Sequence, residues 1–271
     1  MSAKMNPEFP AYYISHGGGP WPWMPEERDT VYAELTAALS GIIPSLPQRP
    51  EAILMVSAHW EEDVFTVQST LKPGMIYDYY GFPEYTYSIN YTSSGNPALA
   101  RDVVRLLRES GIAAGEDERR GYDHGMFSPM AIINPNADIP VVQLSLKTGL
   151  HPHEHIAMGK ALRPLRKERI FIVGSGLSYH NLRLFNYRAE QPSGEFDAWL
   201  RETVTQTRGR ERNTLLEQWE NAPSARIAHP REEHLLPLMV AVGCAEDQDG
   251  ITTYNQTDFM GGIHVSNFRF G

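Results

Sequence analysis

The sequence predicts an α/β fold: a single globular domain spanning residues 1–271, with a central, mostly parallel or mixed sheet covered by helices. Short apolar runs alternate with longer amphipathic runs along the chain, which is the pattern of strands joined by helices. A chain of 271 residues, 41% hydrophobic and 21% charged, is long enough and apolar enough for one sizeable core. Histidines follow several of the apolar runs, and a sheet of this class gathers functional groups at its strand ends.

Seven segments have the composition of strands. Residues 11–15 and 52–58 are continuous apolar runs, as expected for strands that are buried on both faces. Residues 63–70 alternate apolar and polar side chains, as a half-exposed strand does. The remaining predicted strands are residues 139–146, 169–176, 251–259 and 263–270.

Six segments have the period or the end signals of helices. A helix over 25–42 opens with a proline and acidic residues, which a first turn favours. A helix over 96–111 has Asn96 as its N-cap and a glycine at its end. Pro164 is expected to bend or end a helix over 153–167. The other predicted helices are residues 194–208, 211–222 and 231–243.

Residues 77–95 are rich in tyrosine and fit neither the helix period nor the strand period. This segment is either a packed excursion over the sheet or one wall of a pocket for an aromatic substrate, since pocket walls are largely apolar and aromatic.

Composition excludes several classes of partner. The net charge is −9 and no basic patch alternates with aromatic residues, so no nucleic-acid partner is expected. The N-terminal stretch lacks the apolar run of a signal peptide. The longest apolar stretch, residues 235–245, is interrupted by Pro237 and is far shorter than the ~20 residues of a membrane span. We therefore expect a cytoplasmic protein without a membrane partner. Cys244 is the only cysteine, which excludes an intrachain disulfide and a cysteine metal site.

Four histidines indicate a metal site at the strand ends. His16 and His59 close the runs at 11–15 and 52–58, and His180 follows the run at 169–176. His234 lies in the predicted helix over 231–243. Each histidine alone also fits a structural role, but imidazole is a common ligand of zinc, iron and copper, and the shared placement favours a common site.

Other polar residues surround this set in the sequence. His124 lies in a loop before a predicted helix. Glu233 is adjacent to His234 and is expected either to orient an imidazole or to be a ligand itself, so His234 or a neighbouring glutamate completes the site. The HPHEH stretch at residues 151–155 is expected to be a solvated helix start rather than a metal site.

Six motifs occur in one order between residues 12 and 240: SHGGGP, SAHW, YDYYGFPEYTYSINY, GYDHGMFSP, GSGLSYHNLR and HPREEHLLPL. With them the chain resembles the class III extradiol ring-cleavage dioxygenase superfamily, in the DOPA-dioxygenase branch of LigB-like proteins.

The resemblance implies an enzyme of aromatic compound metabolism that inserts O2 into a catechol, either DOPA-like or a small catecholic acid. It implies one non-haem divalent metal, Fe(II) for activity or Zn(II) as purified. His16, His59 and His234 match metal ligands, and His180 matches a histidine at or near the metal with an acid–base role. His124 matches a further pocket histidine that could donate a proton.

Alternatives to the dioxygenase stay open. An all-histidine set adds no negative charge to offset the metal and also suits zinc, which has no redox chemistry. A zinc hydrolase with Glu233 or His180 as base, or a metal-binding protein without dioxygenase activity, would use the same residues. Arg183, Arg231 and Lys147 are candidates to bind a substrate carboxylate or are surface charges. A homo-oligomer is compatible with the sequence.

Overall fold

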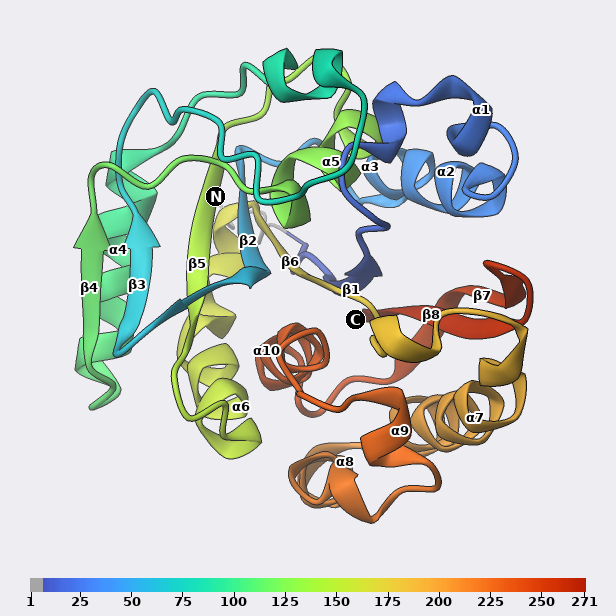
Figure 1. Cartoon of the computed structure of the whole chain (residues 1–271). Helices are drawn as coiled ribbons and strands as arrows, with labels where there is room; N and C mark the ends of the chain where they lie inside the picture. Colours follow the sequence, from blue (N-terminus) through green and yellow to red (C-terminus); the bar gives the residue numbers. More distant parts are fainter. Residues whose placement is uncertain (1–6) are drawn as a thin grey trace.

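Eight strands form one mixed sheet in the order β4-β3-β5-β2-β6-β1-β8-β7, seen in a computed structural model that describes residues 7–271 (Figure 1). Residues 1–6, the first part of the stretch for which the sequence predicts no signal peptide, lie outside the described residues. The strands are β1 (Ala11–Ser15), β2 (Ala52–Glu62), β3 (Phe65–Gln68), β4 (Ala114–Asp117), β5 (Val141–Lys147), β6 (Ile170–Gly176), β7 (Gly250–Phe259) and β8 (Ile263–Phe270).

The four central strands are parallel, and the neighbouring strand on either side of them runs in the opposite direction, with β3 and β4 parallel to each other. Strands β5, β2, β6 and β1 run parallel to one another, so their carboxyl ends lie along one edge. Strand β8 runs antiparallel to β1 and to β7, and β3 runs antiparallel to β5. The predicted mixed α/β fold is therefore confirmed.

Helices cover both faces of the sheet. Helix α10 packs on β6 and β1 beside α6, and α7 packs on β7 and β8, while α5 and α2 lie on the opposite side (Figure 1). The helices are α1 (Pro25–Arg28), α2 (Ala33–Ser40), α3 (Ile42–Ser45), α4 (Pro97–Glu109), α5 (His124–Ile133), α6 (Pro152–Leu162), α7 (Glu190–Gln206), α8 (Gly209–Glu217), α9 (Ala225–Ala228) and α10 (Leu236–Cys244).

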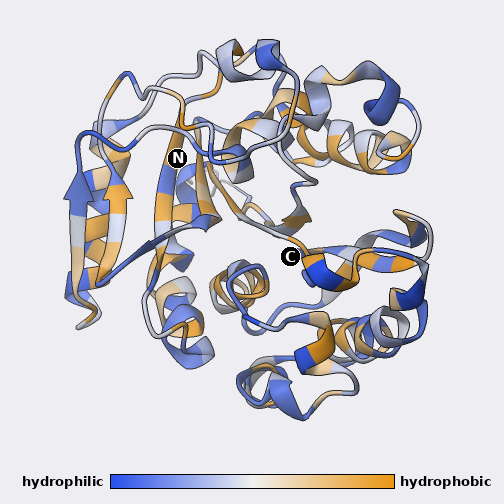
Figure 2. Ribbon diagram, viewed as in Figure 1, coloured by the Kyte–Doolittle hydropathy of each residue, from blue (hydrophilic) through white to orange (hydrophobic). Residues whose placement is uncertain are grey.

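The core lies between the central strands and these helices. Every residue of β1 and β6 is buried, and so is every residue of α10. Figure 2 shows hydrophobic residues along the strands and on α10, with hydrophilic residues concentrated on outer helix faces. Burial on both faces explains why the central strands are continuous apolar runs. Cys244 belongs to this core.

Several predicted helices differ in their bounds from the observed ones. Helix α6 ends at Leu162, just before Pro164, and α8 ends at Glu217, whereas the predicted helices end at 167 and 222. The helix expected over 25–42 is divided into α1 and α2, with a turn at Asp29–Tyr32, where Thr30 and Val31 are weak helix formers, and α3 follows it. The helix expected to start at 231 starts at Leu236. The ring of Pro237 would collide with the Glu233 carbonyl if the helix began earlier, because a proline clashes with the carbonyl four residues before it.

None of the helices within residues 7–271 combines the length and the apolar character that crossing a membrane requires.

Candidate metal centre

The site lies at the carboxyl ends of three adjacent strands, with β6 between β1 and β2. His16 directly follows β1, and its backbone N–H donates to the Gly176 carbonyl at the end of β6 (3.0 Å). His59 comes from the far part of β2, and His234 from the turn before α10. Strand topology therefore brings together residues from both ends of the chain.

A glycine turn holds His16 in place. Gly17 has a positive φ of 75°, and a Cβ there would lie 2.3 Å from the Trp21 indole nitrogen. That nitrogen donates to the carbonyl oxygen of His16 (2.7 Å). The turn thus packs buried Trp21 directly beneath His16, which only glycine allows.

The sequence predicted His59 at the end of a strand, but His59 lies on an irregular stretch within β2. The pairing of β2 with β5 shifts register between Val56 and Glu61. Within that bulge the His59 N–H donates to the Ser57 hydroxyl (3.2 Å), which donates to Asp123 (2.7 Å). Bulges re-aim side chains, and this one directs His59 toward His16.

His234 is anchored through its backbone. Its carbonyl accepts from the Tyr13 hydroxyl (2.8 Å) and from the Leu177 N–H (3.2 Å). A Cβ at Gly176 would lie 2.1 Å from this carbonyl oxygen. The segment before α10 can therefore approach β6 only because residue 176 has no side chain.

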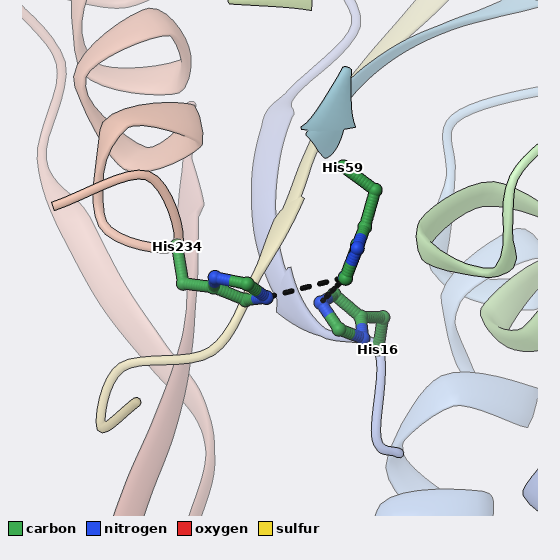
Figure 3. A group of neighbouring side chains, drawn as sticks. All are labelled: His16, His59 and His234. Carbon is green, nitrogen blue, oxygen red and sulfur yellow. Dashed lines mark hydrogen bonds between the residues drawn. The ribbon is translucent and has the colours of Figure 1, made fainter. Parts of the chain in front are cut away.

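The three imidazoles converge through their Nε2 atoms (Figure 3). His59 Nε2 lies 3.3 Å from His16 Nε2 and 3.2 Å from His234 Nε2. Two nitrogens that bind one zinc ion at about 2.0–2.1 Å in tetrahedral geometry lie about 3.3 Å apart. The spacing is therefore that of ligands to a single ion.

The second nitrogen of each ring faces an acceptor. His16 Nδ1 lies 2.6 Å from the Gly17 carbonyl, His59 Nδ1 lies 3.3 Å from Asp78 Oδ2, and His234 Nδ1 lies 2.9 Å from Glu233 Oε1. Nδ1 thus carries the proton in each ring, and Nε2 presents a lone pair. Three lone pairs face one another, an arrangement that repels itself and that a cation stabilises.

Electrostatics keep these rings neutral, as ligation requires. Burial lowers the pKa of His16, His59 and His234 well below the ordinary value, and the neighbouring histidines lower it further.

His124 and His180 extend the cluster toward the pocket. The sequence predicted His124 in a loop before a helix, but it is the first residue of α5, whose N-cap is Asp123. Its Nδ1 lies 2.8 Å from Asp78 Oδ1. His180 Nδ1 lies 3.1 Å from Glu233 Oε1, and its ring stacks on that of His234. His180 groups with Glu233 and His234 and is not part of the group formed by the three converging Nε2 atoms. In the described chain the Nε2 atoms of His124 and His180 have no hydrogen-bond partner, and both residues line the pocket.

Two carboxylates therefore each join a converging histidine to a pocket histidine. Asp78 holds His59 and His124, and Glu233 holds His234 and His180. Burial raises the pKa of Asp78, but the hydrogen bond and charge of His124 outweigh it and hold the pKa at about 2. Burial likewise opposes ionisation of Glu233, and the hydrogen bond from His180 outweighs it, so its pKa is lowered.

Asp78 escaped sequence reasoning altogether. It lies in the tyrosine-rich segment at residues 77–95, whose aromatic residues drew attention instead. A single carboxylate in a segment without a helix or strand period resembles a surface charge, so the sequence carried no signal that would have selected Asp78.

A cavity of about 400 Å³ opens beside the histidines. From the tyrosine-rich segment Asp78 and Phe82 line the cavity, whereas Tyr79, Ile89 and Tyr91 are buried without lining it, so each of the two interpretations holds for part of the segment. The rest of the lining is mainly apolar and consists of Gly17, Gly18, Gly19, Glu27, Tyr32, Leu177, Leu182, Phe185, Phe259 and Met260 together with the five histidines.

The HPHEH stretch departs in part from its predicted solvated state. His151 and His153 are exposed, but His155 is fully buried. Its Nδ1 lies 2.9 Å from the His151 carbonyl, and its Nε2 accepts from the Lys147 N–H (3.3 Å). Helix geometry turns this third histidine toward the core, far from the metal centre.

Residues 10–267 match the family described as the catalytic LigB subunit of aromatic ring-opening dioxygenase. The chain is 35% identical to dioxygenase tasH of Hapsidospora irregularis, over 97% of this chain and 85% of that protein. It is 37% identical to the 4,5-DOPA dioxygenase extradiol of Beta vulgaris, over 80% and 81% of the two chains. It is 30% identical to the protein of the same name from Escherichia coli K12, over 97% and 94%.

The fold has a solved counterpart. A crystal structure of an uncharacterized protein from Escherichia coli K12 superposes with a TM-score of 0.79, at 27% identity, over 97% of this chain and 100% of the other.

Proposed function

Because this chain belongs to the family of the catalytic LigB subunit of aromatic ring-opening dioxygenases, we propose that it is an extradiol dioxygenase. Its substrate is a catechol, its co-substrate is O2, and its cofactor is one non-haem divalent metal. Fe(II) is the active form and Zn(II) an inactive occupant of the same site. The cytoplasmic location and the oligomeric state stay predictions.

One observation carries the proposal: three neutral imidazoles converge at the end of a largely apolar cavity into which two further imidazoles project. Three protein ligands leave coordination positions for substrate. Asp78 and Glu233 place negative charge behind two of the three rings, which supplies the charge that a set of only histidines lacks.

A metal held by His16, His59 and His234 would polarise the two catechol oxygens. As Fe(II) it would let electrons pass from the catechol to O2, so that the catechol is the reductant, the ring opens beside the diol and both oxygen atoms enter the product. His180 and His124 would act as general base and general acid. Their Nδ1 atoms are held by Glu233 and Asp78, so each Nε2 presents a lone pair to the cavity and can accept a catechol hydroxyl proton and return it. The apolar walls exclude water from the reacting ring.

A second candidate is a zinc hydrolase, which the all-histidine ligand set favours. In that reaction Glu233 or His180 would act as the base. Both oxygens of Glu233 already have partners, since Oε1 faces His180 and His234 and Oε2 lies 3.5 Å from Arg231. His180 is therefore the better base of the two.

The test compares two metal forms of one preparation. We expect protein loaded anaerobically with Fe(II) to consume O2 with a simple catechol and to form a yellow ring-opened product, whereas the zinc form does neither. Hydrolysis of an ester panel by the zinc form, without O2 uptake by the iron form, would replace the dioxygenase with the hydrolase.

A further inference from the structure

In the described part of the chain, the lysine, arginine and carboxylate side chains that could charge the cavity are present there only as carboxylates. Among the described residues its lining includes the carboxylates of Glu27 and Asp78 but no lysine or arginine. Both oxygens of Asp78 already have partners, since Oδ2 contacts His59 and Oδ1 contacts His124. Glu27 makes no side-chain hydrogen bond or ion pair with any residue in the range 7–271.

Glu27 is held near the mouth of the cavity. It lies on α1, and its backbone carbonyl accepts from the Tyr32 N–H (3.0 Å). Glu27 is half-buried, whereas His16 and His234 at the inner end are buried. Exposed Leu182 also lines the cavity. The rim of the opening is therefore apolar at Leu182 and carries one carboxylate without a partner among the described residues, that of Glu27.

An aromatic wall runs from this rim inward. Tyr32 stacks on Trp21 with centroids 4.6 Å apart and meets Phe259 edge to face at 5.5 Å, and Phe259 meets Phe185 at 6.2 Å. Burial raises the pKa of Tyr32, and the charge of Glu27 raises it further. The negative potential of Glu27 thus reaches into a low-dielectric wall, where a charge acts strongly.

The three bases that the sequence offered for a substrate carboxylate do not line the cavity. Arg231 pairs with Glu61 and Glu233, and Lys147 pairs with Glu154. Two arginines are adjacent in sequence to residues at the opening: Arg183, which is exposed, follows Leu182, and Arg28 follows Glu27 but pairs with Asp29.

We propose, on the basis of the proposed function, that the cavity selects catechols bearing a protonated amine and disfavours catechols whose side chain is an acid, with Glu27 as the specificity-determining residue. An ammonium group at the mouth would form an ion pair with Glu27. A carboxylate there would stay unpaired beside a like charge, which costs affinity. Of the two substrate types inferred from sequence, a DOPA-like catechol and a small catecholic acid, this proposal favours the type that carries an amine.

Three catechols with side chains of similar length test this: dopamine, ethylcatechol and dihydrocaffeate. Their affinities are measured by titration calorimetry on zinc-loaded protein without O2. We expect dopamine to bind about 5- to 30-fold more tightly than ethylcatechol, the ratio that one well-placed charge pair supplies, and dihydrocaffeate to bind more weakly than ethylcatechol by a similar factor.

Matched variants assign the effect. Glu27→Gln is expected to bring dopamine to the affinity of ethylcatechol while leaving ethylcatechol unchanged. Glu26→Gln, an exposed neighbour on the same helix that does not line the cavity, is expected to change neither. Arg183→Gln is expected to leave dihydrocaffeate unchanged.

Dihydrocaffeate binding as tightly as ethylcatechol, or a dopamine preference that survives in Glu27→Gln, would overturn the inference. O2 uptake with ethylcatechol by the iron form reports on the proposed function separately. If ethylcatechol is cleaved but the three affinities do not follow the order dopamine, ethylcatechol, dihydrocaffeate, only the inference about Glu27 is wrong. If the affinities follow that order but no catechol is cleaved, only the proposed dioxygenase activity is wrong. If none of the three catechols binds, both are wrong.

Discussion

The imidazole rings of His180 and His234 are stacked, with centroids 3.3 Å apart and planes inclined by 19°. Glu233 Oε1 lies within 3.1 Å of Nδ1 of His180 and 2.9 Å of Nδ1 of His234. One carboxylate oxygen therefore orients both a converging histidine and a pocket histidine. Under the proposed function, a change at Glu233 is therefore expected to affect metal binding and proton transfer together.

Replacing Glu233 by glutamine should weaken zinc binding by about 10- to 100-fold, because the amide is a weaker partner for a ligand imidazole. The kcat of the iron form should fall as well, since His180 loses the same support. Chelator competition measures the affinity. Glu232→Gln is the control, since Glu232 pairs with Arg226 outside the cavity. Equal affinities of both variants for zinc would contradict the orienting role.

Alanine at His16, His59 or His234 should each abolish stoichiometric metal binding, because a pair of imidazoles holds an ion far less tightly than three. Metal analysis of the purified variants by mass spectrometry gives the stoichiometry. His153→Ala, at an exposed histidine distant from the site, should bind as the wild type does. Retention of one ion by any of the three variants would remove that residue from the ligand set.

Substituting glutamine for His124 should leave metal content unchanged and lower kcat by roughly 10²- to 10⁴-fold, the usual contribution of a positioned acid or base. The same substitution at His180 should behave alike, because its Nδ1 is occupied by Glu233 and its ring lies against His234. Loss of metal from the His180 variant would instead make His180 a fourth ligand.

Acid should destabilise the fold through His155. Burial lowers the pKa of this imidazole from 6.5 to about 4 in the folded state. Between these values the unfolded chain binds a proton that the folded chain does not, so stability is full above the unfolded pKa and falls as pH decreases. The loss reaches about 2 kcal/mol at pH 5. Urea unfolding of His155→Gln at several pH values should show a correspondingly shallower dependence, with His153→Gln as the control. Identical dependences would exclude His155 as the cause.

Alanine at Gly176 should weaken metal binding at least about tenfold and destabilise the fold by about 1–3 kcal/mol. Its Cβ would lie 2.1 Å from the His234 carbonyl, so the segment that carries His234 must move, and overpacking of this kind costs that much. Calorimetric melting and zinc titration measure the two effects. Gly74→Ala, where a Cβ meets nothing within 4 Å, should have neither effect. A fully active Gly176→Ala would show that the segment can shift without harm.

Sequence reasoning reached most of the fold because its signals are local. Apolar runs identified the central strands, and the caps of α4 matched the sequence signals, with Asn96 accepting from the Leu99 N–H. The short strand β4 and the short helix α9 were not predicted, since four residues have no usable period. The break between α1 and α2 falls at Thr30 and Val31, whose low helix propensity is too weak a signal to place a helix end from sequence.

At the site, the sequence predicted which histidines take part better than it predicted how the backbone places them. The histidines His16, His59, His180 and His234 were selected from strand ends and motifs, and all four line one cavity. The bulge that redirects His59 depends on strand pairing, which the sequence does not show. The later start of α10 follows from Pro237, which the sequence does show. Asp78 and Glu27 were invisible because single carboxylates in loops and short helices resemble surface charge.

The strand order has a consequence for synthesis. Strand β1 pairs only with β6 and β8 among the described strands, and both are made in the second half of the chain. At about 5–20 residues per second, the first strand of a growing chain must wait on the order of 10 s for its neighbour. His16 and His59 leave the ribosome early, but His234 follows near the end. Under the proposed function, an ion that meets the unfinished chain finds at most two of the three proposed ligands, so the complete site forms only after translation is nearly complete.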